Sequence, residues 1–242
     1  KEKILILTPT NKSADVLSRK IISTADSDYP DWLIRFGNSA AVDDEMNSIV
    51  KDRAFSIEDL ESYVVISTIV RLPYDGFSNI KLSGIHWDKV YFDESSMIHI
   101  AYAAYAMKKL NSKKFYFAGD PCQITPIMQF QDWQNENIYE MFELIDFVNP
   151  TTKPKNFPVK TLSTQYRSMK DIGDLFSHYA YSGQVDSMKK ISERNPLHFI
   201  KEDFKAFTLI RFPVSKSERL LNPIRLVYSP YHIYSAIYSI EI

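Results

Sequence analysis

Short apolar runs alternate with amphipathic segments along most of this chain, and this alternation constrains the fold more than any other feature. Runs with the character of buried strands occupy residues 4–7, 63–66, 89–92 and 114–118. After the first run, Ala14, Leu17 and Ile21 recur at helical spacing. Parallel strands need long crossover connections, which are usually helices. The alternation therefore predicts an α/β fold, with a parallel sheet covered by helices on both faces.

The same spacing predicts the elements between these strands. A helix is expected over residues 12–23, with Asn11 as its N-cap. A short strand is expected at 33–36 and a helix near 44–51. Two further helices are marked by apolar residues at helical spacing: Ile98, Tyr102 and Tyr105, and then Ile138, Met141, Phe142 and Ile145.

A proline-rich connector at residues 149–160 provides the best position for a domain boundary. Behind it the pattern restarts, with a strand expected at 159–162, a helix at 171–181 and a strand at 206–211. We therefore expect three parts: a first domain at 1–150, a linker at 151–160 and the beginning of a second domain at 161–242.

Composition excludes several classes of protein. The chain is 45% hydrophobic and 24% charged, as in ordinary globular proteins. It holds no apolar run of about 20 residues, the length that a membrane-spanning helix needs, and no signal-peptide pattern. The single Cys122 excludes an intrachain disulfide and favours an intracellular location, in the cytoplasm or the nucleoid or nucleus. Because the net charge is −1, any binding of nucleic acid must come from local groups.

Two adjacent carboxylates, Asp93 and Glu94, follow the strand expected at 89–92. The carboxyl edge of a parallel sheet is where open α/β folds bind their ligands. One carboxylate there can hold Mg²⁺, usually through water. The other can orient the water that attacks a γ-phosphate. The alternative is an acidic cap on the helix that follows, favoured by the helix dipole.

A second polar turn follows the strand expected at 114–118. It reads Gly119-Asp120-Pro121-Cys122-Gln123-Ile124-Thr125-Pro126. The Gln123 amide can donate to a phosphate oxygen while it accepts from water. The alternative is a surface turn with no ligand.

Other polar residues complete the set of candidates. Arg167, beyond the connector, has the planar guanidinium that suits a two-pronged contact with phosphate, although an ordinary salt bridge is the alternative. Thr8, Thr10 and Thr68 end two other predicted strands. Short hydroxyl groups beside a helix N-terminus can hold the phosphates of a nucleic acid without reading its sequence. The alternative for these threonines is simple helix capping.

One part of an ATP site is missing from the sequence. None of the six glycines is followed by lysine, so the phosphate-binding loop G-x-x-x-x-G-K-[ST] does not occur in these 242 residues.

Taken together, the motifs resemble those of superfamily 1 helicases, specifically the superfamily 1B group related to the nonsense-mediated-decay RNA helicase and its DNA-acting relatives. The resemblance covers residues 4 to about 186 and depends on the order and spacing of the motifs. The matching segments are 5–15 for motif Ia, 65–68 for motif Ic, Asp93-Glu94-Ser95-Ser96 for motif II, 119–126 for motif III, and 162–167 for the motif IV region; Phe176, Tyr181, Gly183 and Val185 follow the same family's pattern.

The resemblance implies a RecA-like P-loop NTPase domain with the start of a second RecA-like domain. It implies that Asp93 coordinates Mg²⁺ through water and that Glu94 activates the attacking water. Gln123 would sense the γ-phosphate of ATP, and Arg167 would reach it from the second domain. Four residues would lie along the path of single-stranded DNA or RNA: Thr8, Thr10, Thr68 and Pro126.

The sequence also departs from the family. Motif I, the phosphate loop, is absent and would be expected before Lys1, whereas motifs V and VI would be expected after Ile242. Ser168-Met169-Lys170 stands where the family often has Met-His-Pro. We therefore expect a fragment, cut at both ends, of an ATP-dependent helicase that moves in the 5′-to-3′ direction.

Two alternative functions stay open. The first is a helicase-like scaffold that binds nucleic acid or protein without catalysis. The second is a P-loop ATPase that does not act on nucleic acid.

Overall fold

The computed structural model describes residues 2–25, 31–37, 49–51, 62–77, 81–126, 136–144, 158–189, 224–225 and 230–231. The chain divides into two compact units, Lys1–Phe157 and Pro158–Ile242. No helix among the described residues is both long and apolar enough to cross a membrane.

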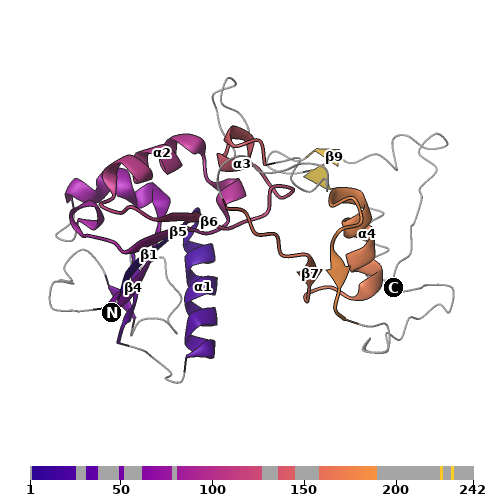
Figure 1. Ribbon diagram of the computed structural model, residues 1–242, viewed down its shortest axis with the longest axis horizontal. Helices are drawn as coiled ribbons and strands as arrows, with labels where there is room; N and C mark the ends of the chain where they lie inside the picture. The colour runs from indigo at the N-terminus through magenta and orange to yellow at the C-terminus, as the bar shows by residue number, and fades with distance from the viewer. Residues whose placement is uncertain are drawn as a thin grey trace. The chain divides into compact units, whose positions relative to one another are not determined.

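The first unit contains a six-stranded sheet in which every neighbouring pair of strands is parallel (Figure 1). In spatial order the strands are β3 (Val50–Lys51), β2 (Leu33–Phe36), β4 (Tyr63–Thr68), β1 (Lys3–Thr8), β5 (Lys89–Phe92) and β6 (Phe115–Phe117). The parallel sheet and its helices confirm the predicted α/β fold.

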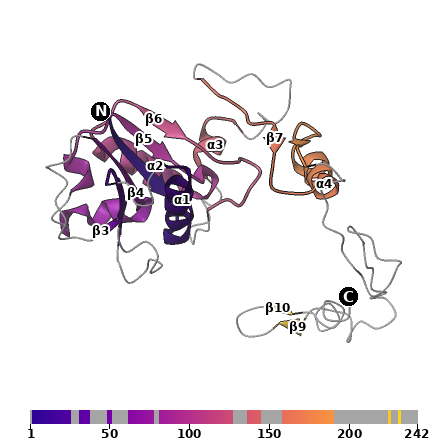
Figure 2. The same cartoon turned by 90° about the horizontal axis from the view of Figure 1, so that it is seen from below.

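Helices cover both faces of this sheet (Figures 1 and 2). Helix α1 (Asn11–Thr24) packs on one face, where Ala14 lies with Ile66 in a small cluster. Helix α2 (Ile100–Lys109) and the 3-10 segment η3 (Ile69–Phe77) pack on the other face, where most of the core lies.

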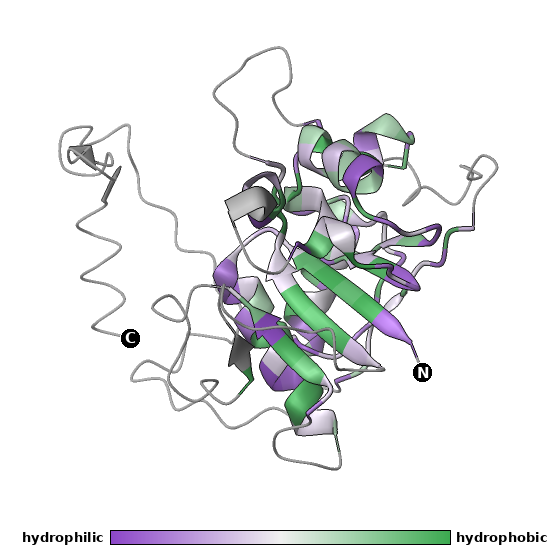
Figure 3. Ribbon diagram, turned by 90° about the vertical axis from the view of Figure 1, so that its left-hand side faces the viewer, coloured by the Kyte–Doolittle hydropathy of each residue, from purple (hydrophilic) through white to green (hydrophobic). Residues whose placement is uncertain are grey.

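Alternation along each strand supplies these two faces. Leu5 and Leu7 belong to the larger cluster, while Ile6 between them faces the cluster under α1. The strands are predominantly hydrophobic when coloured by hydropathy (Figure 3). Such strands are typical of parallel sheets that are buried on both sides.

The remaining described elements are short. In the first unit they are η4 (Leu82–Gly84), η5 (Ser95–Met97) and α3 (Ile138–Met141). In the second unit, β7 (Thr164–Gln165) pairs in parallel with β8 (Asp186–Ser187), and α4 (Lys170–Ala180) joins them. An antiparallel pair is formed by β9 (Ile224–Arg225) and β10 (Pro230–Tyr231).

Several predicted elements need correction. The N-cap of α1 is Thr10 rather than Asn11, because the Thr10 side chain accepts from the Ser13 N–H. Val50–Lys51 is a strand, not the end of a helix, since it pairs with β2; residues 44–48 lie outside the described part. Residues 159–162, which the structure describes, do not form the predicted strand. The strand nearest to them is β7, at Thr164–Gln165. The strand predicted at 206–211 and Ile145 lie outside the described residues.

A buried ion pair, which the sequence did not reveal, links α1 to β2. The Arg35 Nε atom lies 2.9 Å from Asp15 Oδ1, and both side chains are almost fully buried. Removing one partner of such a pair leaves an uncompensated charge in a medium of low dielectric constant.

We expect Asp15→Ala to lower the free energy of unfolding by about 3–5 kcal/mol, because it leaves the Arg35 charge buried and unpaired. The matched control is Glu2→Ala, which breaks the partly exposed pair between Glu2 and Lys89 and should lower the free energy of unfolding far less, because water screens the two charges. Urea unfolding followed by tryptophan fluorescence measures both. Equal losses in the two variants would contradict the assigned role of the buried pair.

Candidate active site

The chain leaves two neighbouring strands of the sheet in opposite directions. From β1 it passes through α1 to β2, on one side of β1, whereas from β5 it passes through α2 to β6, on the other side. In open α/β sheets, ligands bind outside the carboxyl ends of the strands at such a switch point. Asp93 follows β5 directly, and Thr8 ends β1. The predicted carboxylates therefore lie at the expected edge.

Backbone hydrogen bonds fix the turn that carries the carboxylates. The Asp93 N–H donates to the carbonyl of Leu7, at 2.9 Å. The Ser95 N–H donates to the carbonyl of Ala118, also at 2.9 Å. Glu94, between them, has left-handed backbone angles, φ 51° and ψ 46°, which are uncommon for a residue other than glycine. These contacts join the ends of β1, β5 and β6.

Burial raises the pKa of the Asp93 carboxyl above its ordinary value of 3.8, and a backbone hydrogen bond from Glu94 offsets part of the rise. Among the described residues, no basic side chain forms an ion pair with Asp93. A half-buried carboxylate of this kind suits a bound cation, because a positive charge would favour its ionised form.

Gly119 lets the second polar turn approach the first. A Cβ atom at this position would lie 2.7 Å from the backbone nitrogen of Ser95 and 3.0 Å from the Tyr139 hydroxyl oxygen. Its φ of 157° also lies in a range that side chains with a Cβ rarely adopt. The glycine of the predicted motif is therefore required by the close contact of the two turns.

Gln123 folds back on its own turn. Its Nε2 atom donates to Asp120 Oδ2 at 3.0 Å, and the Cys122 N–H donates to Asp120 Oδ1 at 2.9 Å. The Gln123 side chain is exposed, so its amide can exchange this contact for one with a ligand.

Tyr139 joins the site, although the sequence pattern gave no reason to select it. Burial raises the pKa of its hydroxyl to about 12, against the effect of a hydrogen bond with Ser95. The rise is increased by the negative charges of three nearby carboxylates: Asp120, Glu94 and Asp93. The hydroxyl is therefore a protonated donor beside three acids.

Asn137, the N-cap of α3, holds the segment that carries Tyr139 in place. Its Oδ1 atom accepts from the Tyr139 N–H at 2.8 Å, and its Nδ2 atom donates to the Ser96 carbonyl at 3.2 Å. An asparagine before a helix predicts a cap. The contact with Ser96, 41 residues earlier in the chain, has no sequence signal.

The predicted nucleic-acid residues of β1 and β4 also meet at this edge. Thr8 and Thr68 are partners in the register of the two strands. The Thr8 hydroxyl is fully buried and donates to the Thr10 carbonyl, whereas Thr10 is exposed and caps α1. Thr8 therefore shapes the loop, and Thr10 is the member that faces solvent. Pro126 is buried.

Arg167 belongs to the second unit, where it lies in the loop between β7 and α4. The side chain of Gln165 accepts from the Ser168 N–H at 2.8 Å and donates to the Ser187 hydroxyl at 2.9 Å. The Arg167 carbonyl accepts from Lys189 Nζ at 2.9 Å, and the Arg167 residue is exposed. The loop between β7 and α4 is thus held at several points, and Arg167 is an exposed residue of this loop.

The donor set limits how a metal ion can be held. In the described part of the chain, no three His, Cys, Asp or Glu side chains gather as a metal site. Mg²⁺ is commonly bound through one or two carboxylates, with water and substrate phosphates as the other ligands. Asp93 fits that role.

Neither a scan against protein-family models nor a search of the curated proteins finds a match to this chain.

The raised pKa of Asp93 predicts a change of stability with pH. Between 3.8 and the higher folded value, the folded state binds more protons than the unfolded state, so stability falls as the pH rises through this window. Asp93→Asn should remove this fall, because the amide has no charge to bury. Urea unfolding of both proteins across that range measures it, with exposed Asp174→Asn as the control. Parallel pH profiles in the wild type and Asp93→Asn would contradict the assignment.

Proposed function

We propose that this chain is part of an ATP-dependent helicase or translocase with RecA-like domains, similar to the superfamily 1B group. The observation that carries the proposal is the joining of two polar turns at the switch point of a parallel sheet. One turn carries Asp93 and Glu94, and the other carries Asp120 and Gln123. Phosphoryl transfer requires a cation-binding carboxylate, a group that orients water and donors to phosphate.

The side chains take separate roles in this proposal. Asp93 holds Mg²⁺ through water, and Glu94 accepts a proton from the attacking water and orients it. Gln123 exchanges its contact with Asp120 for one with the γ-phosphate of ATP. Arg167 supplies positive charge to the same phosphate. Bound Mg²⁺ would neutralise charge on the phosphate oxygens.

Single-stranded DNA or RNA is the proposed partner. Thr10 is exposed at the N-terminus of α1, a 14-residue helix whose dipole favours phosphate. Thr68 lies on the neighbouring strand β4, beside Thr8. Contacts of this kind fix a backbone without reading the bases, which suits movement along any sequence.

A second candidate is a helicase-like scaffold that binds nucleic acid or protein without catalysis. The helicase and the scaffold make different predictions about the coding sequence upstream of Lys1. A G-x-x-x-x-G-K-[ST] loop between a strand and a helix there would support the helicase, and its absence would support the scaffold.

In the full natural protein, we expect Arg167→Ala to lower ATP turnover by about 10³–10⁵, the range for arginine fingers. Glu94→Gln should also lower it strongly, because a neutral amide orients water but does not accept its proton. The matched control is Glu140→Gln, an exposed glutamate of α3, which should turn over ATP as the wild type does. The assay measures phosphate release with and without single-stranded nucleic acid. Undiminished turnover would remove the changed residue from the mechanism, and absence of stimulation would favour an ATPase that does not act on nucleic acid.

The 242-residue chain by itself is expected to hydrolyse ATP negligibly, because its sequence has no phosphate loop to hold the nucleotide. Phosphate release by the purified chain, compared with its Glu94→Gln variant, measures this. Rapid release that depends on Glu94 would show that another segment holds the phosphates.

A further inference from the structure

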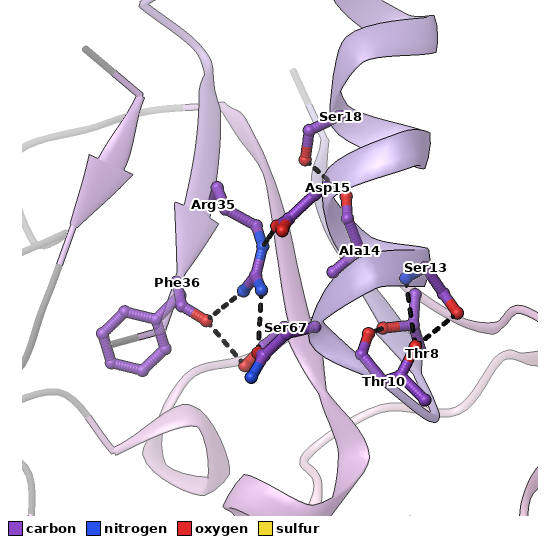
Figure 4. A network of polar contacts seen from close by, with 10 residues as sticks. Thr8, Thr10, Ser13, Ala14, Asp15, Ser18, Arg35, Phe36 and Ser67 are labelled. Carbon is purple, nitrogen blue, oxygen red and sulfur yellow. Dashed lines mark hydrogen bonds and ion pairs between the residues drawn. The ribbon is translucent and has the colours of Figure 1, made fainter. Parts of the chain in front are cut away.

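One buried guanidinium contacts groups from both α1 and β2 (Figure 4). Arg35 lies in β2 and is fully buried. Its Nε atom donates to Asp15 Oδ1 on α1 at 2.9 Å, and its Nη2 atom donates to Asn11 Oδ1, also on α1, at 2.9 Å. Its Nη1 atom donates to the carbonyl of Phe36, at the end of β2, at 2.9 Å. All three nitrogens of the guanidinium are therefore engaged.

These contacts continue to the neighbouring strand β4. The Ser67 hydroxyl donates to the same Phe36 carbonyl at 2.9 Å, so Arg35 and Ser67 share one acceptor (Figure 4). Ser67 directly precedes Thr68 at the end of β4. The guanidinium is thereby connected to the position of Thr68.

The contacts also continue to the loop between β1 and α1. Asn11 directly follows Thr10, whose hydroxyl accepts from the Ser13 N–H at 3.1 Å. The Thr10 carbonyl accepts from the Thr8 hydroxyl at 2.9 Å. The carboxyl ends of β1, β2 and β4 are thus joined through one side chain.

A guanidinium is suited to hold these groups in place. Its donors lie in a rigid plane, so partners must take fixed positions to be hydrogen-bonded. A buried cation that lacks such partners is strongly unfavourable. Movement of Asn11 or of the Phe36 carbonyl would leave a buried donor unpaired, and the loop is therefore held against such movement.

We propose that Arg35 is a positioning residue for the nucleic-acid path: it braces the β1–α1 loop and the ends of β2 and β4, so that the exposed Thr10 is presented to a sugar–phosphate backbone while the buried Thr68 is held in place at the end of β4. This inference rests on the proposed function, because it presumes that this edge binds nucleic acid.

Binding of a fluorescein-labelled oligodeoxythymidylate by the full natural protein tests the proposal. Arg35→Lys keeps the charge but not the planar fork, and Asn11→Ala removes only the contact of Arg35 with the first residue of α1. Each should raise the Kd about tenfold, which corresponds to about 1.4 kcal/mol. The matched control is Ser18→Ala, which removes a buried hydroxyl that donates to the Ala14 carbonyl within α1. Wild-type affinity in both test variants would overturn the proposal.

The double variant separates bracing from direct contact. If Asn11 acts through Arg35, the two changes together should raise the Kd little more than the larger one alone. Independent effects that multiply would show that Asn11 contacts the strand directly, and would overturn the bracing role. If Arg35→Lys does not fold, the exchange rate of the Ser13 amide in Asn11→Ala decides, because this variant changes an exposed residue of the first turn of α1.

Amide hydrogen exchange tests whether Arg35 braces the loop without requiring that the protein binds nucleic acid. The Ser13 amide is held by Thr10, so Asn11→Ala should speed its exchange at least about tenfold, while Ser18→Ala should leave it unchanged. If the wild type binds no oligonucleotide, the proposed function fails, and this exchange rate alone decides whether Arg35 braces the loop. Unchanged exchange in Asn11→Ala would overturn the bracing.

Discussion

Strand β1 pairs in parallel with β4 along one edge and with β5 along the other, and its carboxyl end therefore lies between two segments that carry proposed site residues. On one side, the register places Thr8 beside Thr68. On the other side, the Leu7 carbonyl accepts from the Asp93 N–H. The proposed nucleic-acid path and the proposed ATP site thus meet at one peptide of one strand. A change in position at either site has a short physical route to the other, although coupling between them requires a measured difference in binding.

Several unusual local features lie close to the carboxylates of Asp93 and Glu94. Glu94 adopts left-handed backbone angles, Asp93 has a raised pKa, and Gly119 lies where a side chain does not fit. The first two features are unfavourable for stability by themselves, a side chain at position 119 would add a clash, and all three positions fall within two turns that touch. Proteins concentrate such features at sites of function. This grouping adds a physical argument to the resemblance of the motifs.

The sequence predicts the parallel sheet and its principal strands, because alternation of apolar residues is a local property. It also predicts which edge carries Asp93 and Gln123, since Asp93 directly follows β5 and Gln123 lies in the turn that follows β6. It does not predict Tyr139, whose hydroxyl reaches Ser95 across 44 residues of chain. Nor does it predict the Arg35–Asp15 pair, because a charged residue in a short strand reads as exposed. The local pattern predicts a helix that includes Val50–Lys51, but pairing with β2 overrides this preference and makes the segment a strand. The domain boundaries and the residue roles stay predictions.

The most direct test of the account is a structure of the full natural protein with Mg²⁺ and a non-hydrolysable ATP analogue. We predict that the metal lies within one water molecule of the Asp93 carboxylate. We also predict that the γ-phosphate lies within hydrogen-bonding distance of Gln123. A nucleotide bound away from the carboxyl ends of β5 and β6, with no metal near Asp93, would contradict it.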